Sequence, residues 1–295
     1  MTGRICAFNF FSTFNRIFKC QIMHFLIIPW NPNPEVLRIG HFAIRWYGLL
    51  FASSFLIGYF LMRKMFRNEG LTDDLLDRLT IYMAIGTVVG ARLGHCLFYE
   101  PSYYLSHPLE ILAVWQGGLA SHGAALGILA ALGIFCYREK KGYFWVLDRI
   151  AVIVALSGFL IRMGNLMNSE IYGIETSLPW GFVFLRNHEL VPKHPTQIYE
   201  GGTYLLIFFL LLWMYWRKKG DVYQGLLISI FLILVFTARF FIEFVKEVQV
   251  AFESKMTLNM GQLLSIPFII LGFLGLYLSL KIKKPGVIRK AAEKK

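Results

Sequence analysis

Charged residues are scarce in this chain. Only 16% of its 295 residues are Asp, Glu, Lys or Arg, whereas 56% are hydrophobic and 16% are aromatic. Because an ordinary soluble domain carries about 25% charged residues, the composition argues against that class. Apolar runs of about 18 or more residues recur along the chain, and each is long enough to cross about 30 Å of hydrocarbon. We therefore expect an all-α integral membrane protein that crosses the membrane several times.

Cysteines are also few, and their spacing fits neither a metal site nor a dense disulfide framework. They are Cys6, Cys20, Cys96 and Cys136, and we interpret them as packing residues. The start of the chain lacks a clean secretory signal, because its apolar pattern is broken and no small-residue cleavage site follows. We interpret residues 1–22 as an N-terminal extension before a plausible start at Met23. A polytopic domain over 23–281 and a basic tail over 282–295 would complete the chain.

The chain has a net charge of +12, from 30 Lys and Arg against 18 Asp and Glu. Its basic residues lie mainly in alternate loops. The segments RKMFR, REKK and RKKG follow the first, third and fifth apolar runs, whereas YEPSYYLSHPLE after the second run holds no Lys or Arg. Basic loops mark the cytoplasmic side of a membrane. We expect the amino terminus outside, the carboxyl terminus in the cytoplasm, and membrane lipids rather than nucleic acid as partners.

The apolar runs predict about seven transmembrane helices. They cover residues 44–62, 79–98, 112–137, 146–166, 198–216, 223–244 and 262–280. The longest outside segment, residues 168–195, lies between the fourth and fifth spans, and its prolines in LPWGFVF and VPKHP predict turns. We expect a small extracytoplasmic head there.

Polar residues gather at the end of the fourth span, in the segment GFLIRMGNLMNSEIYG. Arg162, Asn165 and Asn168 follow one another at intervals of three, which holds successive members on neighbouring parts of one helix face. Glu170 and Gly173 come where the helix should end. An ionisable group inside a span costs about 2.5–3.5 kcal/mol on insertion scales, so an unpaired one is expelled or kept for a task. We expect this segment to form one wall of a polar cavity.

Arginines also occupy the outer halves of two other predicted spans. Arg92 in the second span and Arg239 in the sixth would join Arg162 at one depth. Because guanidinium forks match phosphate oxygens, an anionic phospholipid is the expected guest. Glu243 follows Arg239 at the four-residue spacing of an intrahelical ion pair, a pair that would equally fit a purely structural neutralisation.

Two histidines and a tyrosine have both a chemical and a structural interpretation. His122 lies in WQGGLASHGAALG, where glycines allow tight helix packing, yet its ring can take a proton near neutral pH. His194 precedes Pro195 in HPTQIYE and would equally fit a turn. Tyr47 would fit an interfacial aromatic belt or a headgroup site. The sequence leaves these alternatives open.

Five motifs together resemble one enzyme family. RWYG, GGLASHG, RMGNLMNSEIYG, HPTQIYE and ARFFIEF occur in the order and spacing of the prolipoprotein diacylglyceryl transferases, over residues 29–280. In that family a tyrosine often stands four residues before the arginine of the sixth span, and an arginine often follows the glutamate. Here these places hold Val235 and Lys246. Neither departure removes a core motif residue.

The resemblance implies a multi-pass enzyme of the bacterial plasma (inner) membrane. Such an enzyme moves the diacylglyceryl group of phosphatidylglycerol onto the thiol of the lipobox cysteine in a preprolipoprotein signal peptide. Glycerol 1-phosphate leaves and a thioether remains, as the first step of lipoprotein maturation. This chemistry requires no metal or other cofactor.

The positions that match the family's motifs are Tyr47, His122, Arg162, Asn165, Asn168, Glu170, Gly173, His194, Arg239 and Glu243, and this chemistry suggests a role for each of them. Arg162 and Arg239 are expected to bind the phosphate and stabilise its growing charge, while Glu243 fixes Arg239. The remaining residues expected to bind or orient the substrate are Tyr47, Asn165, Asn168, Gly173 and His194.

The base that deprotonates the thiol has two candidates. His122 is the first choice and Glu170 the second, because a free thiol with a pKa of about 8.5 needs only modest help from either. The rival function is a secondary transporter of an anionic solute, since intramembrane Arg, Glu and His would also suit such a protein.

Overall fold

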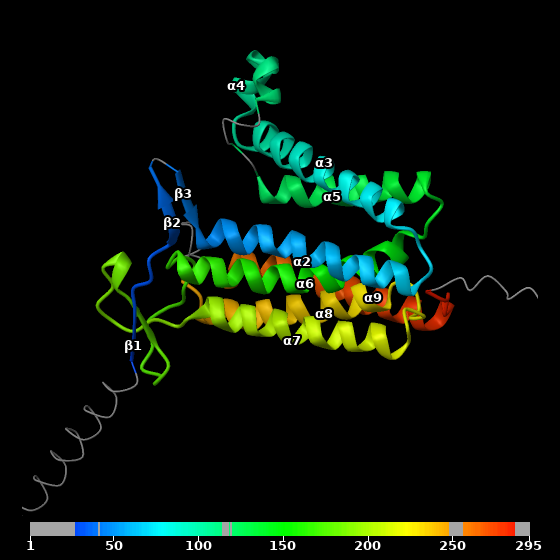
Figure 1. Ribbon diagram of the computed structural model, residues 1–295. Coiled ribbons are helices and arrows are strands. Elements are labelled where there is room, and N and C mark those ends of the chain that lie inside the picture. Colours follow the sequence, from blue (N-terminus) through cyan, green and yellow to red (C-terminus); the bar gives the residue numbers. More distant parts are fainter. Residues whose placement is uncertain (1–26, 41, 114–117, 119, 248–255, 287–295) are drawn as a thin grey trace, which may run out of the picture. The chain divides into compact units, whose positions relative to one another are not determined.

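Figure 1 shows the computed structural model of the chain. It describes residues 27–286 apart from residues 41, 114–117, 119 and 248–255. Within this part, six helices are long and apolar enough to cross a membrane. They are α2 (Trp46–Asn68), α3 (Asp73–Phe98), α6 (Tyr143–Met167), α7 (Thr196–Arg217), α8 (Leu226–Ile242, continued by the 3₁₀ turn η4, Glu243–Val245) and α9 (Met260–Ile282). The predicted all-α, multi-pass membrane class is confirmed, while the orientation in the membrane stays a prediction.

The third predicted span begins later than expected. The prediction started it at residue 112, but the apolar helix found there is the shorter α5 (Ser121–Arg138). Gly118 has a φ of +66°, a left-handed conformation that an α-helix does not contain. Two short helices, α4 (Pro101–Ser106) and the 3₁₀ helix η1 (Pro108–Leu112), occupy the preceding segment.

The chain divides into two compact units. Unit 1 consists of Met1–Ser54, Ser157–Leu206 and Leu234–Ile269, and unit 2 consists of Phe55–Leu156, Ile207–Ile233 and Ile270–Lys295. The predicted extension, residues 1–22, lies outside the described residues, as do Cys6 and Cys20.

Unit 1 contains two small sheets that the sequence did not predict. Strand β1 (Ile28–Trp30) pairs in parallel with β4 (Phe182–Phe184), and β2 (Glu35–Ile39) pairs antiparallel with β3 (Phe42–Arg45). The indole of Trp30 donates a hydrogen bond to the carbonyl oxygen of Leu166 at 2.9 Å, and Phe182 packs against it. The head between α6 and α7 is thus ordered, and β1 ties it to the last turn of α6.

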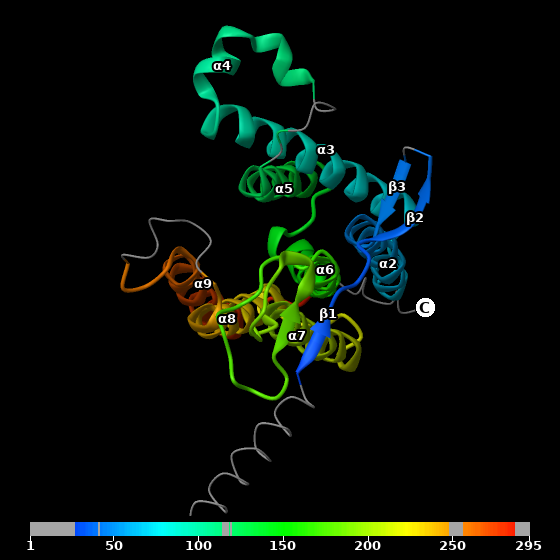
Figure 2. The ribbon, with the colours of Figure 1, turned by 90° about the vertical axis from the view of Figure 1, so that its left-hand side faces the viewer.

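Unit 2 contains a helix pair that small residues hold at close distance. Helices α3 and α5 lie side by side in both views of the ribbon (Figures 1 and 2). A Cβ added to Gly90 of α3 would lie 2.4 Å from the carbonyl oxygen of Gly123, and one added to Gly127 of α5 would lie 2.1 Å from that of Gly86. The glycines of the SHGAALG motif therefore serve tight helix packing, as the structural interpretation held. Cys96 and Cys136 in these helices are buried and free.

Candidate functional site

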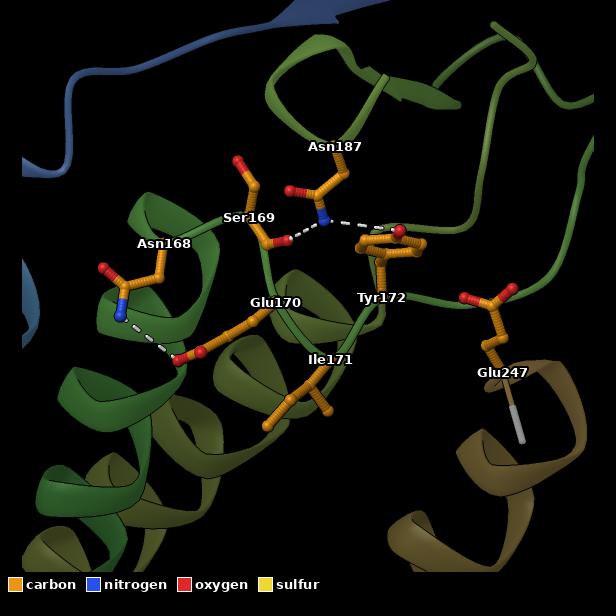
Figure 3. Close-up of a pocket in the computed structure, with 7 residues that line it drawn as sticks. All are labelled: Asn168, Ser169, Glu170, Ile171, Tyr172, Asn187 and Glu247. Carbon is orange, nitrogen blue, oxygen red and sulfur yellow. Dashed lines mark hydrogen bonds between the residues drawn. The ribbon is translucent and has the colours of Figure 1, made fainter. Parts of the chain in front are cut away.

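The polar side chains at the end of α6 contact one another. The guanidinium of Arg162 donates to Oδ1 of Asn165 at 3.3 Å, and the amide of Asn165 donates to Oε1 of Glu170 at 2.8 Å. Asn168 donates to the same oxygen at 3.3 Å, a bond that Figure 3 shows. Asn165 is 5% exposed, so the centre of this hydrogen-bond network is buried inside the protein. The structure brings together Asn165, which the sequence placed on one face with Arg162 and Asn168, and Glu170, which it placed at the end of the helix.

The turn after α6 is strained, and the motif HPTQ holds it. Ser169 has a φ of +55° and Ile171 a φ of +61°, conformations that cost free energy for any residue with a side chain and most for a β-branched one. Gln197 donates to the carbonyl oxygen of Glu170 at 2.8 Å, and Thr196 donates to that of Ile171 at 2.9 Å. These two bonds from the start of α7 fix the carboxylate of Glu170 relative to α6.

Glu200 joins two cations in the interior of unit 1. Glu200 is 1% exposed. One of its carboxylate oxygens pairs with Nε of Arg162, and the other lies 3.3 Å from Nζ of Lys246. Lys246 also lies 3.5 Å from Oε2 of Glu243. A buried carboxylate needs such partners, because desolvation opposes its charge. The sequence prediction gave Glu200 no role. Its only signal was an acidic residue within the apolar span that HPTQIYE opens.

The predicted ion pair between Arg239 and Glu243 is wrong. Helix α8 ends at Ile242, and Glu243 begins the 3₁₀ turn η4, so the α-helical four-residue geometry is not maintained. Glu243 turns to Lys246 and packs over Gly261, where an added Cβ would lie 2.5 Å from its carboxyl carbon. Arg239, in contrast, makes no ion pair or hydrogen bond to a side chain of the described residues. It is an intramembrane cation with its guanidinium available.

Two tyrosines of unit 1 lie next to this cluster. The ring of Tyr47 packs on the backbone of α6, since a Cβ on Gly164 would lie 2.9 Å from its Cδ2 atom. The phenol of Tyr204 on α7 lies close enough to Arg162, Arg239 and Glu200 to interact with their charges. Val235, which stands where the family often has a tyrosine, is buried. Tyr204 therefore brings a hydroxyl near Arg239 from a different helix, and the sequence prediction did not include it.

Gly173 and His194 form a close backbone contact. The amide of Gly173 donates to the carbonyl oxygen of His194 at 2.8 Å, and a Cβ on Gly173 would lie 2.2 Å from the carbonyl oxygen of Val245. Nδ1 of His194 lies 3.1 Å from the hydroxyl of Tyr199, which accepts a bond from the Trp180 indole at 2.9 Å. Burial lowers the pKa of His194. In this geometry both residues hold the chain segments around the cluster in place.

A pocket of about 420 Å³ opens beside the end of α6 (Figure 3). Its lining combines polar and apolar groups and comes entirely from unit 1: Asn168, Ser169, Glu170, Ile171, Tyr172, Asn187 and Glu247. The amide of Asn187 donates to the carbonyl oxygen of Ser169 at 2.7 Å and so helps to shape the strained turn. The pocket and the cluster share Asn168 and Glu170.

Arg92 and His122 belong to unit 2 and are not part of the cluster just described. The guanidinium of Arg92 is buried and donates to the carbonyl oxygens of Ile111 at 2.9 Å and of Glu110 at 2.6 Å. Arg92 thus holds the segment after α3, which gives this arginine a structural explanation. His122 lies in the first turn of α5, is exposed, and makes no hydrogen bond to a described residue. Among the residues that the structure describes, no group of His, Cys, Asp and Glu could hold a metal ion.

Comparison with known proteins places the whole described core in one family. Residues 34–278 match the sequence profile of the family described as prolipoprotein diacylglyceryl transferase. The chain is 48% identical over 255 residues to the phosphatidylglycerol–prolipoprotein diacylglyceryl transferase of Tolumonas auensis. The matched region covers 86% of this chain and 98% of that protein. The protein of the same name from Chloroherpeton thalassium is 48% identical, over 85% of this chain and 94% of that protein. That from Porphyromonas gingivalis is 46% identical, over 83% and 92% respectively.

Proposed function

This chain belongs to the prolipoprotein diacylglyceryl transferase family, and from that premise we propose which of its residues carry out the reaction. It is a multi-pass membrane transferase of lipoprotein maturation. Its substrates are phosphatidylglycerol and a prolipoprotein, after which its relatives are named. The rival function, transport of an anionic solute, has no support from these relatives.

The reaction forms a carbon–sulfur bond and breaks a carbon–oxygen bond. The thiolate of the lipobox cysteine attacks the glycerol carbon that bears the phosphate, and the thiol proton passes to a base. Glycerol 1-phosphate leaves with the electron pair of the broken bond, and a thioether joins the diacylglyceryl group to the cysteine. The protein must therefore remove one proton and stabilise one phosphate leaving group.

The observation that carries the proposal is the unpaired state of Arg239. Arg162 pairs with Glu200, and Lys246 pairs with both Glu200 and Glu243, whereas Arg239 pairs with no carboxylate of the described residues. A cation kept in a span without an acidic partner needs an anion from outside the chain. The phosphate of phosphatidylglycerol is such an anion, and a guanidinium binds it through two parallel hydrogen bonds.

Arg162 completes the phosphate site in this proposal. Its Nε is occupied by Glu200 and one terminal nitrogen donates to Asn165, which fixes the guanidinium plane and leaves its other N–H groups to bind the phosphate. Asn165, Asn168 and Tyr47 orient the headgroup through hydrogen bonds, since Asn165 and Asn168 already lie in one network with Arg162. Glu200 is a positioning residue here, because it acts through the two cations that it holds. Gly173 and His194 support the substrate site through the backbone bond between them.

His122 is the proposed base and Glu170 the alternative. Neither ring nitrogen of His122 makes a hydrogen bond to a described residue. Oε1 of Glu170 already accepts hydrogen bonds from the amides of Asn165 and Asn168, so this oxygen is engaged within the cluster. An imidazole can accept a proton at a ring nitrogen, so His122 is the first choice.

The setting follows from the same proposal. The protein lies in the bacterial inner membrane with its amino terminus outside and its basic loops in the cytoplasm. The ends of α6 and α8 and the starts of α2, α7 and α9 would then face the outside, and unit 1 contains all five. This is the side on which the lipobox cysteine of an exported prolipoprotein emerges.

The experiment that tests the function uses the purified full chain in phosphatidylglycerol vesicles with a lipobox peptide. We expect the peptide to gain the mass of one diacylglyceryl group and one glycerol phosphate to be released for each transfer. A peptide with Ser in place of the lipobox Cys should gain nothing. If the Cys peptide keeps its mass while a related enzyme modifies it in the same vesicles, the function is rejected.

A further inference from the structure

The pocket beside α6 is larger than a phospholipid headgroup requires. It is an open pocket with a volume of about 420 Å³, within the range of sites that bind whole small ligands, whereas the headgroup of phosphatidylglycerol beyond its phosphate is a single three-carbon unit. Asn187 lies in the head, on the short helix η3 (Leu185–Asn187), and Glu247 lies two residues after Val245, the last residue of the candidate span formed by α8 and η4. The pocket therefore extends from the end of α6 into the part of unit 1 beyond the spans.

The lining of the pocket accepts hydrogen bonds and carries negative charge. Glu170 and Glu247 contribute carboxylates, and none of the seven lining residues is a cation. Lys193 lies 3.4 Å from a carboxylate oxygen of Glu247, but it also pairs with Glu189 at 3.6 Å, so one cation serves two carboxylates. Figure 3 shows the side chain of Glu247 on the opposite side of the pocket from Glu170.

One lining group lacks its own partner. Ser169 is 1% exposed, and its hydroxyl oxygen makes no hydrogen bond to a described residue. A buried hydroxyl without a partner is costly, so such a group points to a ligand or a bound water.

We propose that this pocket receives the first residues of the prolipoprotein that follow the acceptor cysteine, and that it favours a basic side chain there. The proposal rests on the proposed function. The lipobox cysteine ends the membrane-inserted part of the signal peptide, so the residues after it must lie outside the spans, as the pocket does. Backbone N–H groups and a Lys or Arg side chain are donors that match its carboxylate and amide oxygens.

The test compares two lipobox peptides that differ only in the two residues after the cysteine, Lys-Lys or Asp-Asp. The ratio of their kcat/KM values is measured for the parent protein, for Glu247→Lys and for Glu175→Lys. Glu175 is an exposed acidic residue of the same unit that pairs through its backbone with Lys193 but does not line the pocket, so its substitution makes the same change in charge beside Lys193 without changing the lining. Anionic vesicles attract the Lys peptide by themselves, and the comparison between variants removes that effect.

We expect Glu247→Lys to lower the preference for the Lys peptide by about tenfold and Glu175→Lys to leave it within about twofold of the parent ratio. Glu247→Gln should fall between the parent and Glu247→Lys, and circular dichroism checks that each variant is folded. An equal ratio in the parent and Glu247→Lys would overturn the proposal. So would a raised KM for phosphatidylglycerol with an unchanged peptide ratio, because the pocket would then serve the headgroup. Failure of the parent to modify any peptide would instead reject the proposed function.

Discussion

Glu200 on α7 pairs with both Arg162 on α6 and Lys246 after η4, and its side chain is 2% exposed. Two cations from segments 84 residues apart in the sequence therefore depend on one buried carboxylate. The negative charge of Glu200 offsets the repulsion between Arg162 and Lys246 and so allows both cations to lie beside it. This relationship underlies the first prediction.

Glu200→Gln should destabilise the protein by about 3–5 kcal/mol, because it leaves buried cations without their counter-charge. Thermal unfolding in detergent measures the effect, and Glu175→Gln at an exposed site is the control. The double variant Glu200→Gln with Lys246→Met should lose less stability than the sum of the two single variants, since it removes one of the orphaned charges. An unchanged melting temperature for Glu200→Gln would show that the two ion pairs contribute nothing.

Arg162→Lys should reduce transfer by about 10²–10³-fold while the protein remains folded. An ammonium keeps the charge, but it cannot hold Glu200 through Nε, contact Asn165 and bind phosphate as a planar fork. Steady-state kinetics with varied phosphatidylglycerol separates lost binding from lost turnover. Normal turnover by this variant would remove Arg162 from the phosphate site.

Gly173→Ala should destabilise the protein by about 1–3 kcal/mol and reduce transfer. The new Cβ would lie 2.2 Å from the carbonyl oxygen of Val245, a backbone atom that cannot move away alone. Gly202→Ala is the matched control, because an added Cβ there meets nothing within 4 Å. Equal melting temperatures for the two variants would contradict the close packing at Gly173.

His194 should make the protein less stable in mild acid. Burial lowers the pKa of His194 in the folded protein below its ordinary value of about 6.5, so the unfolded chain binds this proton first as pH falls. Stability is then lost from about pH 6.5 down to the folded pKa and is unaffected by this group above that range. Melting temperatures from pH 7.5 to pH 5 should fall less steeply for His194→Gln than for the parent. Parallel curves would argue against a lowered pKa of His194 in the folded protein.

The spans and the motif residues were predictable, because they depend on local patterns. Apolar run length found all six long helices, and the spacing of Arg162, Asn165 and Asn168 placed them on one face, as their contacts confirm. The strands β1 and β4 were missed, since each has only 3 residues and they pair across more than 150 residues of chain. Pairing at that distance leaves no periodic signal in either segment.

Partner choice was harder to predict than position. The four-residue spacing of Arg239 and Glu243 predicts an ion pair only if both residues lie in one α-helix. Helix α8 ends at Ile242, before Glu243, so this condition is not met. Glu200 was visible as an acidic residue within a span, but its two partners lie on other segments. Sequence spacing predicts contacts within a helix, whereas contacts between helices depend on how the helices pack.

Arg239 provides the most direct test of the account, because its proposed role is to bind phosphate and not to stabilise the fold. Transfer activity and melting temperature should be measured together for Arg239→Gln, with Arg186→Gln, an exposed arginine of the head, as the control. The account predicts a loss of transfer of about 10²-fold or more for Arg239→Gln at an unchanged or higher melting temperature, since no ion pair of the described residues is broken. Full activity in this variant, or a loss of activity explained by unfolding, would contradict the central claim.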